Sequence, residues 1–69
     1  MKLEYDKDTD AAYVYLKFPI GDGEVKKTKQ VHEDIMFDFD DKGKLIGVEI
    51  LNASRVLNKE DLLAAEQLV

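Results

Sequence analysis

Residues 35–50 read Ile35-Met36-Phe37-Asp38-Phe39-Asp40-Asp41-Lys42-Gly43-Lys44-Leu45-Ile46-Gly47-Val48-Glu49-Ile50. Apolar side chains recur at every second position before and after the Lys42-Gly43 pair, and this period of two is typical of β-strands. The stretch therefore predicts an antiparallel hairpin with strands at residues 35–40 and 44–51.

The length of the hairpin turn follows from the apolar side chains that must share a face. A two-residue loop at Lys42-Gly43 sets six of them on one face, in the pairs Phe39 with Ile46, Phe37 with Val48, and Ile35 with Ile50. A three-residue loop ending at Gly43 would shift the register by one residue and set Asp38 beside Ile46. We therefore predict the two-residue loop, in which Gly43 supplies the positive φ.

The remaining sequence predicts three more strands and one helix. The strands are predicted at residues 2–5, 11–18 and 24–32, with clear alternation in residues 11–18 and poor alternation in residues 24–32. The last of these is rich in lysine, which suits a sheet edge because lysine there discourages pairing with other chains. Asn58 is a good N-cap for a helix over residues 59–68. The predicted fold class is α+β: one domain, residues 1–69, with an antiparallel β-meander of four to five strands and a short C-terminal helix.

The predicted C-terminal helix is amphipathic. Leu62, Ala65 and Val69 lie on one side of it, and Leu63 and Leu68 broaden the apolar stripe. A helix of this length is marginal by itself in water, so it must dock on another surface. The sequence leaves open whether that surface is the sheet of the same chain or a second chain.

Composition narrows the classes of function. The chain has 69 residues, no cysteine, one histidine and a formal net charge of −5. A domain of this size buries only about 60% of its unfolded surface and usually gains support from disulfides, a metal or a partner chain. The acidic charge argues against a general nucleic-acid or anionic membrane surface. No apolar run could span a bilayer and the first residues are too polar for a signal peptide, so we expect a cytoplasmic protein.

One segment matches the calcium loop of EF-hands at Asp38, Asp40, Gly43 and Glu49. That loop joins two helices, whereas the period of two predicts strands on both sides. Lys42 would moreover place a cation in the shell of the ion. We favour a plain hairpin, with a metal site or an acid–base pair built from Asp38, Asp40 and Glu49 as the alternative.

Other titratable residues lack the partners that catalysis needs. Asp6, Asp8 and Asp10 form a second carboxylate cluster, but it has no turn glycine. His32 has no serine or cysteine partner in a known arrangement, and Ser54 lacks the glycine pattern of a nucleophile elbow. We therefore predict no catalytic residue and no cofactor.

Tyr13 and Tyr15 alternate with the apolar residues of their strand and so lie on the second face of the sheet. With Lys26, Lys27, Lys29 and Arg55 they could stack on single-stranded nucleic acid, but protection of a sheet edge explains the lysines better. An aromatic second face and a leucine-rich helix suggest a protein interface. Its candidate residues are Tyr13, Tyr15, Leu62, Leu63 and Leu68. We expect a homo-oligomer, with a dimer favoured, and neither nucleic acid nor a membrane as a partner.

Several short motifs, taken in order, resemble one small prokaryotic family. They are Tyr5-Asp6, Asp10-Ala11-Ala12-Tyr13, Asp38-x-Asp40-x-x-Gly43, Gly47-x-Glu49-Ile50 and Ala53-Ser54. Together they are similar to domain of unknown function 2283 over almost the whole chain, up to the last helical turns. Asn52 stands where many relatives carry an acidic residue, and the helix after Asn58 is less typical of the family.

The resemblance implies no chemistry, because the family has no established activity, cofactor or catalytic residue. Some relatives look like companions of small toxin-like proteins encoded nearby, which implies an antitoxin-like, neutralising role. An acidic domain suits a small basic protein partner through charge complementarity. The expected function is therefore a small protein-interaction module, and in its finer form a neutraliser of a partner protein.

Overall fold

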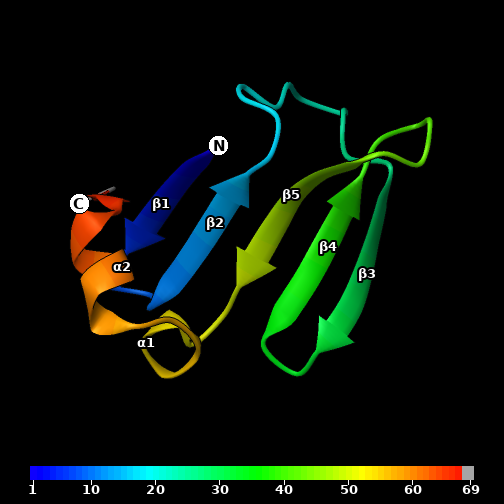
Figure 1. Ribbon diagram of the computed structural model, residues 1–69. Coiled ribbons are helices and arrows are strands. Elements are labelled where there is room, and N and C mark those ends of the chain that lie inside the picture. The colour runs from blue at the N-terminus through cyan, green and yellow to red at the C-terminus, as the bar shows by residue number, and fades with distance from the viewer. Residues whose placement is uncertain (68–69) are drawn as a thin grey trace.

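The computed structural model describes residues 1–67 and consists of one sheet with two short helices (Figure 1). The chain order of the elements is β1 (Lys2–Asp6), β2 (Ala11–Tyr15), β3 (Lys27–His32), β4 (Ile35–Phe39), β5 (Leu45–Ile50), α1 (Ala53–Val56), α2 (Lys59–Ala64) and β6 (Glu66–Gln67). The strand order across the sheet is β3-β4-β5-β2-β1-β6. Strands β1 to β5 pair antiparallel, and this confirms the predicted α+β class.

The β4–β5 hairpin has the predicted pairs at its open end but a different turn. Ile35 pairs with Ile50 and Phe37 with Val48, as predicted. The two-residue loop is wrong: Asp40 N–H donates to the Lys44 carbonyl at 2.9 Å, which leaves three residues in the loop, with Gly43 at φ 77°. A carboxylate oxygen of Asp40 also accepts the N–H groups of Lys42 and Lys44, both at 2.9 Å, and these bonds favour the longer loop.

A β-bulge then cancels the shift that the longer loop introduces. Phe39 pairs with Leu45 instead of Ile46, whereas Asp38 pairs with Gly47, so Ile46 is the extra residue on β5. The carbonyl of Ile46 accepts the N–H groups of both Leu16 and Lys17, at 3.0 and 3.2 Å. This shared acceptor ends the regular ladder, which is why β2 stops at Tyr15 and not at the predicted residue 18.

Strand β3 lies at the edge of the sheet, where a lysine-rich strand was predicted. It begins at Lys27 and not at residue 24, because Glu24 closes a turn with Gly21. In that turn the Glu24 carboxylate accepts the Gly21 N–H at 2.8 Å, and the Glu24 N–H donates to the Gly21 carbonyl at 3.1 Å. All six residues of β3 are exposed.

The predicted helix over residues 59–68 is wrong at residues 65–67. Helix α2 ends at Ala64, Ala65 is extended, and Glu66–Gln67 form β6, which pairs in parallel with β1. The open edge of β1 offers backbone hydrogen-bonding groups, and the ion pair between Lys2 and Glu66 at 3.0 Å favours this pairing. The short helix α1 lies between β5 and α2, where the sequence predicted no helix. Leu68 lies outside the described residues.

The helices cover one face of the sheet, which we call the apolar face (Figure 1). Its core consists of Ala12, Ile50 and Ala53, each no more than 5% exposed. Side chains packed against this core are Leu3, Tyr5, Val14, Val48, Val56, Leu57 and Leu62. These residues belong to β1, β2, β5 and the helices. The helices therefore cover the β1–β2 side of the apolar face, while the β4 side chains Ile35, Phe37 and Phe39 stay half-buried outside this cluster.

Candidate protein interface

The face opposite the helices carries the two tyrosines of β2, and we call it the tyrosine face. The rings of Tyr13 and Tyr15 meet edge to face, with centroids 4.8 Å apart. Tyr15 makes the same kind of contact with Phe18, at 5.1 Å, and the Lys2 ammonium lies 4.0 Å from the centre of the Phe18 ring. Phe18 is 55% exposed. The result is a row of aromatic rings on a face that the helices leave open.

The Tyr13 side chain crosses a neighbouring strand to reach β4. Its hydroxyl donates to the Asp38 carboxylate at 2.6 Å, and Thr28 on β3 donates to the same carboxylate at 2.6 Å. Gly47 lies beneath the Tyr13 ring, and a Cβ at that position would overlap the tyrosine hydroxyl. Burial, together with the bond to Asp38, raises the pKa of Tyr13 above its usual value. Tyr13 is therefore a neutral hydrogen-bond donor at physiological pH.

A second polar chain runs from Tyr15 toward the other edge of the sheet. The Tyr15 hydroxyl donates to Glu4 at 2.7 Å, and this bond raises the pKa of Tyr15. Lys2 is 3.4 Å from the Glu4 carboxylate and 3.0 Å from that of Glu66, and the bond to Glu66 is the main reason that its pKa is raised. Hydrogen bonds and ion pairs thus hold side chains of this face from β3 to β6.

Two small hollows flank Tyr13. One, of about 230 Å³, is lined by Tyr13, Tyr15 and Ile20. The other has a similar volume of about 230 Å³, and its lining includes the carboxylates of Glu4, Asp6 and Glu49. Sites for small-molecule ligands are usually larger, at about 300–1,000 Å³. These hollows are of a size for side chains of a protein partner.

The three carboxylates of the metal hypothesis lie in separate local arrangements. Asp38 accepts hydrogen bonds from Tyr13 and Thr28. Asp40 closes the hairpin turn, and the N–H of Lys44 is the main cause that lowers the pKa of Asp40. Glu49 pairs with Tyr13 on one side and Met36 on the other. In the described part of the chain, no three histidine, aspartate or glutamate side chains form a group that could hold a metal ion.

Asp10 fastens α1 to the loop between β1 and β2, a role that the sequence did not suggest. Asp10 has a positive φ of 55°, and its carbonyl accepts the Ala53 N–H at 2.8 Å. Its carboxylate accepts the Ser54 N–H at 3.0 Å, the Ser54 hydroxyl at 2.7 Å and the Tyr5 hydroxyl at 2.7 Å. The Ser54 hydroxyl is the main cause that lowers the pKa of Asp10. Ser54 is thus bound to Asp10 and serves as a structural residue.

Asp34 holds α1 from the other side. It is 6% exposed, and its carboxylate accepts bonds from Asn52 and Arg55, each at 3.0 Å. The Asn52 amide is the main cause that lowers the pKa of Asp34. His32 accepts the Asp34 N–H at 3.2 Å. His32 and Arg55, like Ser54, therefore take part in local structure around the helix.

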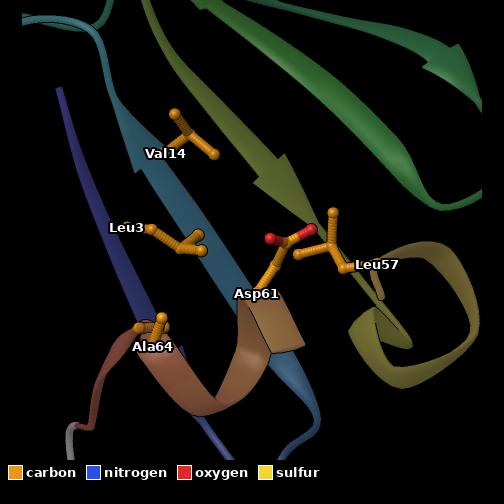
Figure 2. A pocket seen from close by; sticks show the side chains of 6 residues that line it. Leu3, Val14, Leu57, Asp61 and Ala64 are labelled. Carbon is orange, nitrogen blue, oxygen red and sulfur yellow. The ribbon is translucent and has the colours of Figure 1, made fainter. Parts of the chain in front are cut away.

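The five interface candidates do not share one surface. Tyr13 and Tyr15 lie together on the tyrosine face. Leu62 packs against the core from the opposite side, and Leu63, on the same helix, is 73% exposed. Between α2 and the sheet lies a hollow of about 310 Å³, lined by Leu3, Val14, Leu57, Asp61, Ala64 and Ala65 (Figure 2). Leu68 falls outside the described residues. Within residues 1–67, no helix is long and apolar enough to cross a membrane.

Comparison with known proteins places these features in a family. Residues 2–54 match the model of the family described as "Protein of unknown function (DUF2283)". An uncharacterized protein of Methanocaldococcus jannaschii is 42% identical over 65 residues, which cover 91% of this chain and 52% of that protein. The chain thus spans about half the length of this relative. No solved structure matches the chain.

The chain belongs to this family of unknown function, as its motifs suggested. The structure gives those motifs a physical meaning. Tyr5 and Ser54 both donate hydrogen bonds to Asp10, and these bonds attach α1 to the β1–β2 loop. The hydrogen bond from Tyr13 to Asp38 passes over Gly47 and links β2 to β4. The matched residues 2–54 therefore contain most of the side chains that organise the tyrosine face and attach α1, and Arg55 and Glu66 lie beyond them.

Proposed function

We propose that this member of a family of unknown function is a protein-interaction module whose tyrosine face binds a basic protein partner. The observation that carries the proposal is the combination of aromatic rings, half-buried at Tyr13 and Tyr15 and exposed at Phe18, with carboxylates on a face without a covering layer. Tyrosine and phenylalanine are enriched at protein interfaces, because they offer large contact areas with few rotatable bonds.

The charges of this face favour a cationic partner. Glu4, Asp6 and Glu49 line one hollow beside Tyr13. The lysines nearby are already paired, Lys2 with Glu4 and Glu66, and Lys17 with Glu24. A partner carrying lysine or arginine would find acceptors there, and the net charge of −5 would speed its approach.

In its finer form, the proposal is that the module neutralises its partner, as an antitoxin does. The family resemblance implies such a role, because some relatives look like companions of small toxin-like proteins. A small basic ribonuclease-like protein in the cytoplasm fits the chemistry of the tyrosine face. Covering the basic surface with which such a partner holds RNA would block its activity.

The test is co-purification from the native host with a tagged chain. Glu49→Lys reverses one charge on the tyrosine face, and Glu60→Lys makes the same change on the exposed α2, away from that face. We expect the wild type and Glu60→Lys to retain the same basic protein, and Glu49→Lys to lose it. Salt of about 0.5 M should weaken the complex, because it screens exposed charges.

The result can also go against the proposal. Recovery of the chain alone, or equal recovery of the partner with Glu49→Lys, would overturn it. Circular dichroism of both variants establishes that each is folded before the comparison is made. If a purified partner is in hand, inhibition of its activity by the wild type then tests the finer, neutralising role.

A further inference from the structure

The apolar face has an uncovered part, which we call the bare half. It is the β3–β4 side of that face, where Ile35, Phe37 and Phe39 of β4 are only half-buried. The rings of Phe37 and Phe39 are 6.4 Å apart and form one apolar patch. Lys27 and Lys29 of β3 pair with Phe39 and Phe37, and so they flank the patch on the same face. Helix α2 lies beside β1 and β2, at the other end of the sheet, and α1 lies past the ends of β2 and β5 (Figure 1).

The surface of the chain is large for its mass. It exposes 4785 Å², against about 4,400 Å² expected for a folded monomer of 7.9 kDa. The half-buried side chains of Ile35, Phe37 and Phe39 are part of this surface. A contiguous apolar patch with a charged rim marks an interaction site in soluble proteins.

We infer that a second copy of this chain covers the bare half, related by a two-fold axis parallel to the strands. Symmetry selects this axis. A two-fold axis across the strands would place the helices of one copy on those of the other and keep the bare halves apart. An axis along the strands reverses the strand order, so that bare half meets bare half as two packed sheets, about 10 Å apart.

The same axis creates a complementary charge contact. It sets the β3 edge of each copy beside the helix layer of the other. In Figure 2, Asp61 lies with Leu57 on the side of that layer toward β5, whereas Ala64 lies toward β1. An acidic group on α2 thus comes next to the lysine-bearing edge strand of the partner copy.

Lys29 and Asp61 also lie at the same position along the direction of the strands. Val14, Val48, Phe37 and Lys29 form one row across the sheet through their pairings. Asp61 lines the same hollow as Val14 and so lies near the other end of this row. A two-fold axis along the strands preserves height, and it therefore brings Lys29 of one copy close to Asp61 of the other. Opposite charges at this distance attract, and the partner's lysine stem can lie over the apolar side chains of the hollow.

The experiment measures self-association of the purified chain by sedimentation equilibrium, without any other protein present. We expect a dimer of twice 7.9 kDa. Lys29→Glu and Asp61→Lys should each raise the dissociation constant about tenfold or more. Mixing these two variants should restore association, because the mixed dimer contains two opposite-charge pairs. The double variant Lys29→Glu with Asp61→Lys should also dimerise. Lys7→Glu, an exposed charge reversal in the β1–β2 loop, is the matched control and should leave the constant unchanged.

Three results would overturn the inference: a monomer at all concentrations, a dimer that ignores both substitutions, or no restoration on mixing. The three substituted residues are exposed and charged, and circular dichroism shows whether each variant is folded. The dimer uses the apolar face and the proposed partner uses the tyrosine face. Loss of one in its own assay is therefore distinguishable from loss of the other.

Discussion

The two faces of this sheet are held by different forces. The apolar face is built by packing, with Ala12, Ile50 and Ala53 at its centre, and only part of it is covered. The tyrosine face is built by hydrogen bonds, such as those from Tyr13 to Asp38 and from Tyr15 to Glu4. A phenylalanine side chain stabilises the fold only when it is buried, whereas a tyrosine can remain at the surface because its hydroxyl forms hydrogen bonds there. The difference teaches that the apolar face is stabilised by covering its side chains, whereas the tyrosine face is stabilised by hydrogen bonds within the face itself.

The largest expected effect comes from breaking the packed face under the helices. Ile50→Ala should lower the free energy of unfolding by about 3 kcal/mol, because Ile50 is 5% exposed and contacts the core. Urea denaturation measures this loss. Val31→Ala, on the exposed edge strand at 45% exposure, should cost no more than about 0.5 kcal/mol. Equal costs at the two positions would contradict this account of the core.

A smaller effect is expected beneath the hydrogen-bonded face. Gly47→Ala should destabilise by about 2 kcal/mol, because the new methyl group overlaps the Tyr13 hydroxyl. Tyr13→Ala removes that clash, so the double variant should lose less than the sum of the single losses. A double-mutant cycle in urea gives the coupling. Simple additivity would show that Tyr13 does not lie over Gly47.

A single hydrogen bond on the tyrosine face should matter less again. Tyr13→Phe should cost about 1 kcal/mol, because it leaves the Asp38 carboxylate with Thr28 as its remaining side-chain donor. Tyr15→Phe is the matched control and should cost less, since Glu4 keeps Lys2 nearby. Thermal unfolding of the two variants compares them, and a larger loss for Tyr15→Phe would go against the expectation.

The smallest expected effect is the loss of stability at low pH, and it should occur around α1. The pKa values of Asp10 and Asp34 are lowered by their hydrogen bonds to α1 and the residue before it. Their contribution to stability is present above the unfolded pKa of about 3.9 and is lost as the pH falls through the lower folded value. Hydrogen exchange should therefore show faster opening at Ala53 and Ser54 below about pH 4 than at pH 7, relative to β4 amides. Asp10→Asn should show this opening already at pH 7.

The sequence was informative where one periodicity decides the structure. Alternation in residues 35–50 predicted the pairs Ile35 with Ile50 and Phe37 with Val48, and these are present. It failed at the turn because two one-residue shifts, the longer loop and the bulge at Ile46, cancel. The alternation of apolar residues at the open end of the hairpin is the same with or without these two shifts, so it cannot detect them. The end of α2 at Ala64 was missed because the free edge of β1, distant in sequence, competes with the helix for Glu66 and Gln67.

The polar contacts were harder to predict, because they join residues far apart in the chain. Ser54 and Asp10 are 44 residues apart, and the positive φ of Asp10 gives no sequence signal beyond its residue type. The Tyr13–Asp38 contact had one detectable signal. Gly47 interrupts an otherwise regular strand, and a glycine there often marks the close approach of another group. Together with an aromatic residue on the neighbouring strand, it could have located the centre of the tyrosine face.

The two rims of the sheet decide how any partner can be recognised. At one rim, β3 carries lysines and an irregular register between Gln30 and His32. At the other, β6 pairs with part of β1 through the two residues Glu66 and Gln67, the last that the structure describes. Within residues 1–67, neither rim offers a long, regular ladder of backbone groups onto which a foreign strand could be added. Exposed lysines and an irregular register at an edge strand discourage pairing with foreign strands, so these rims favour recognition of the domain through its side chains.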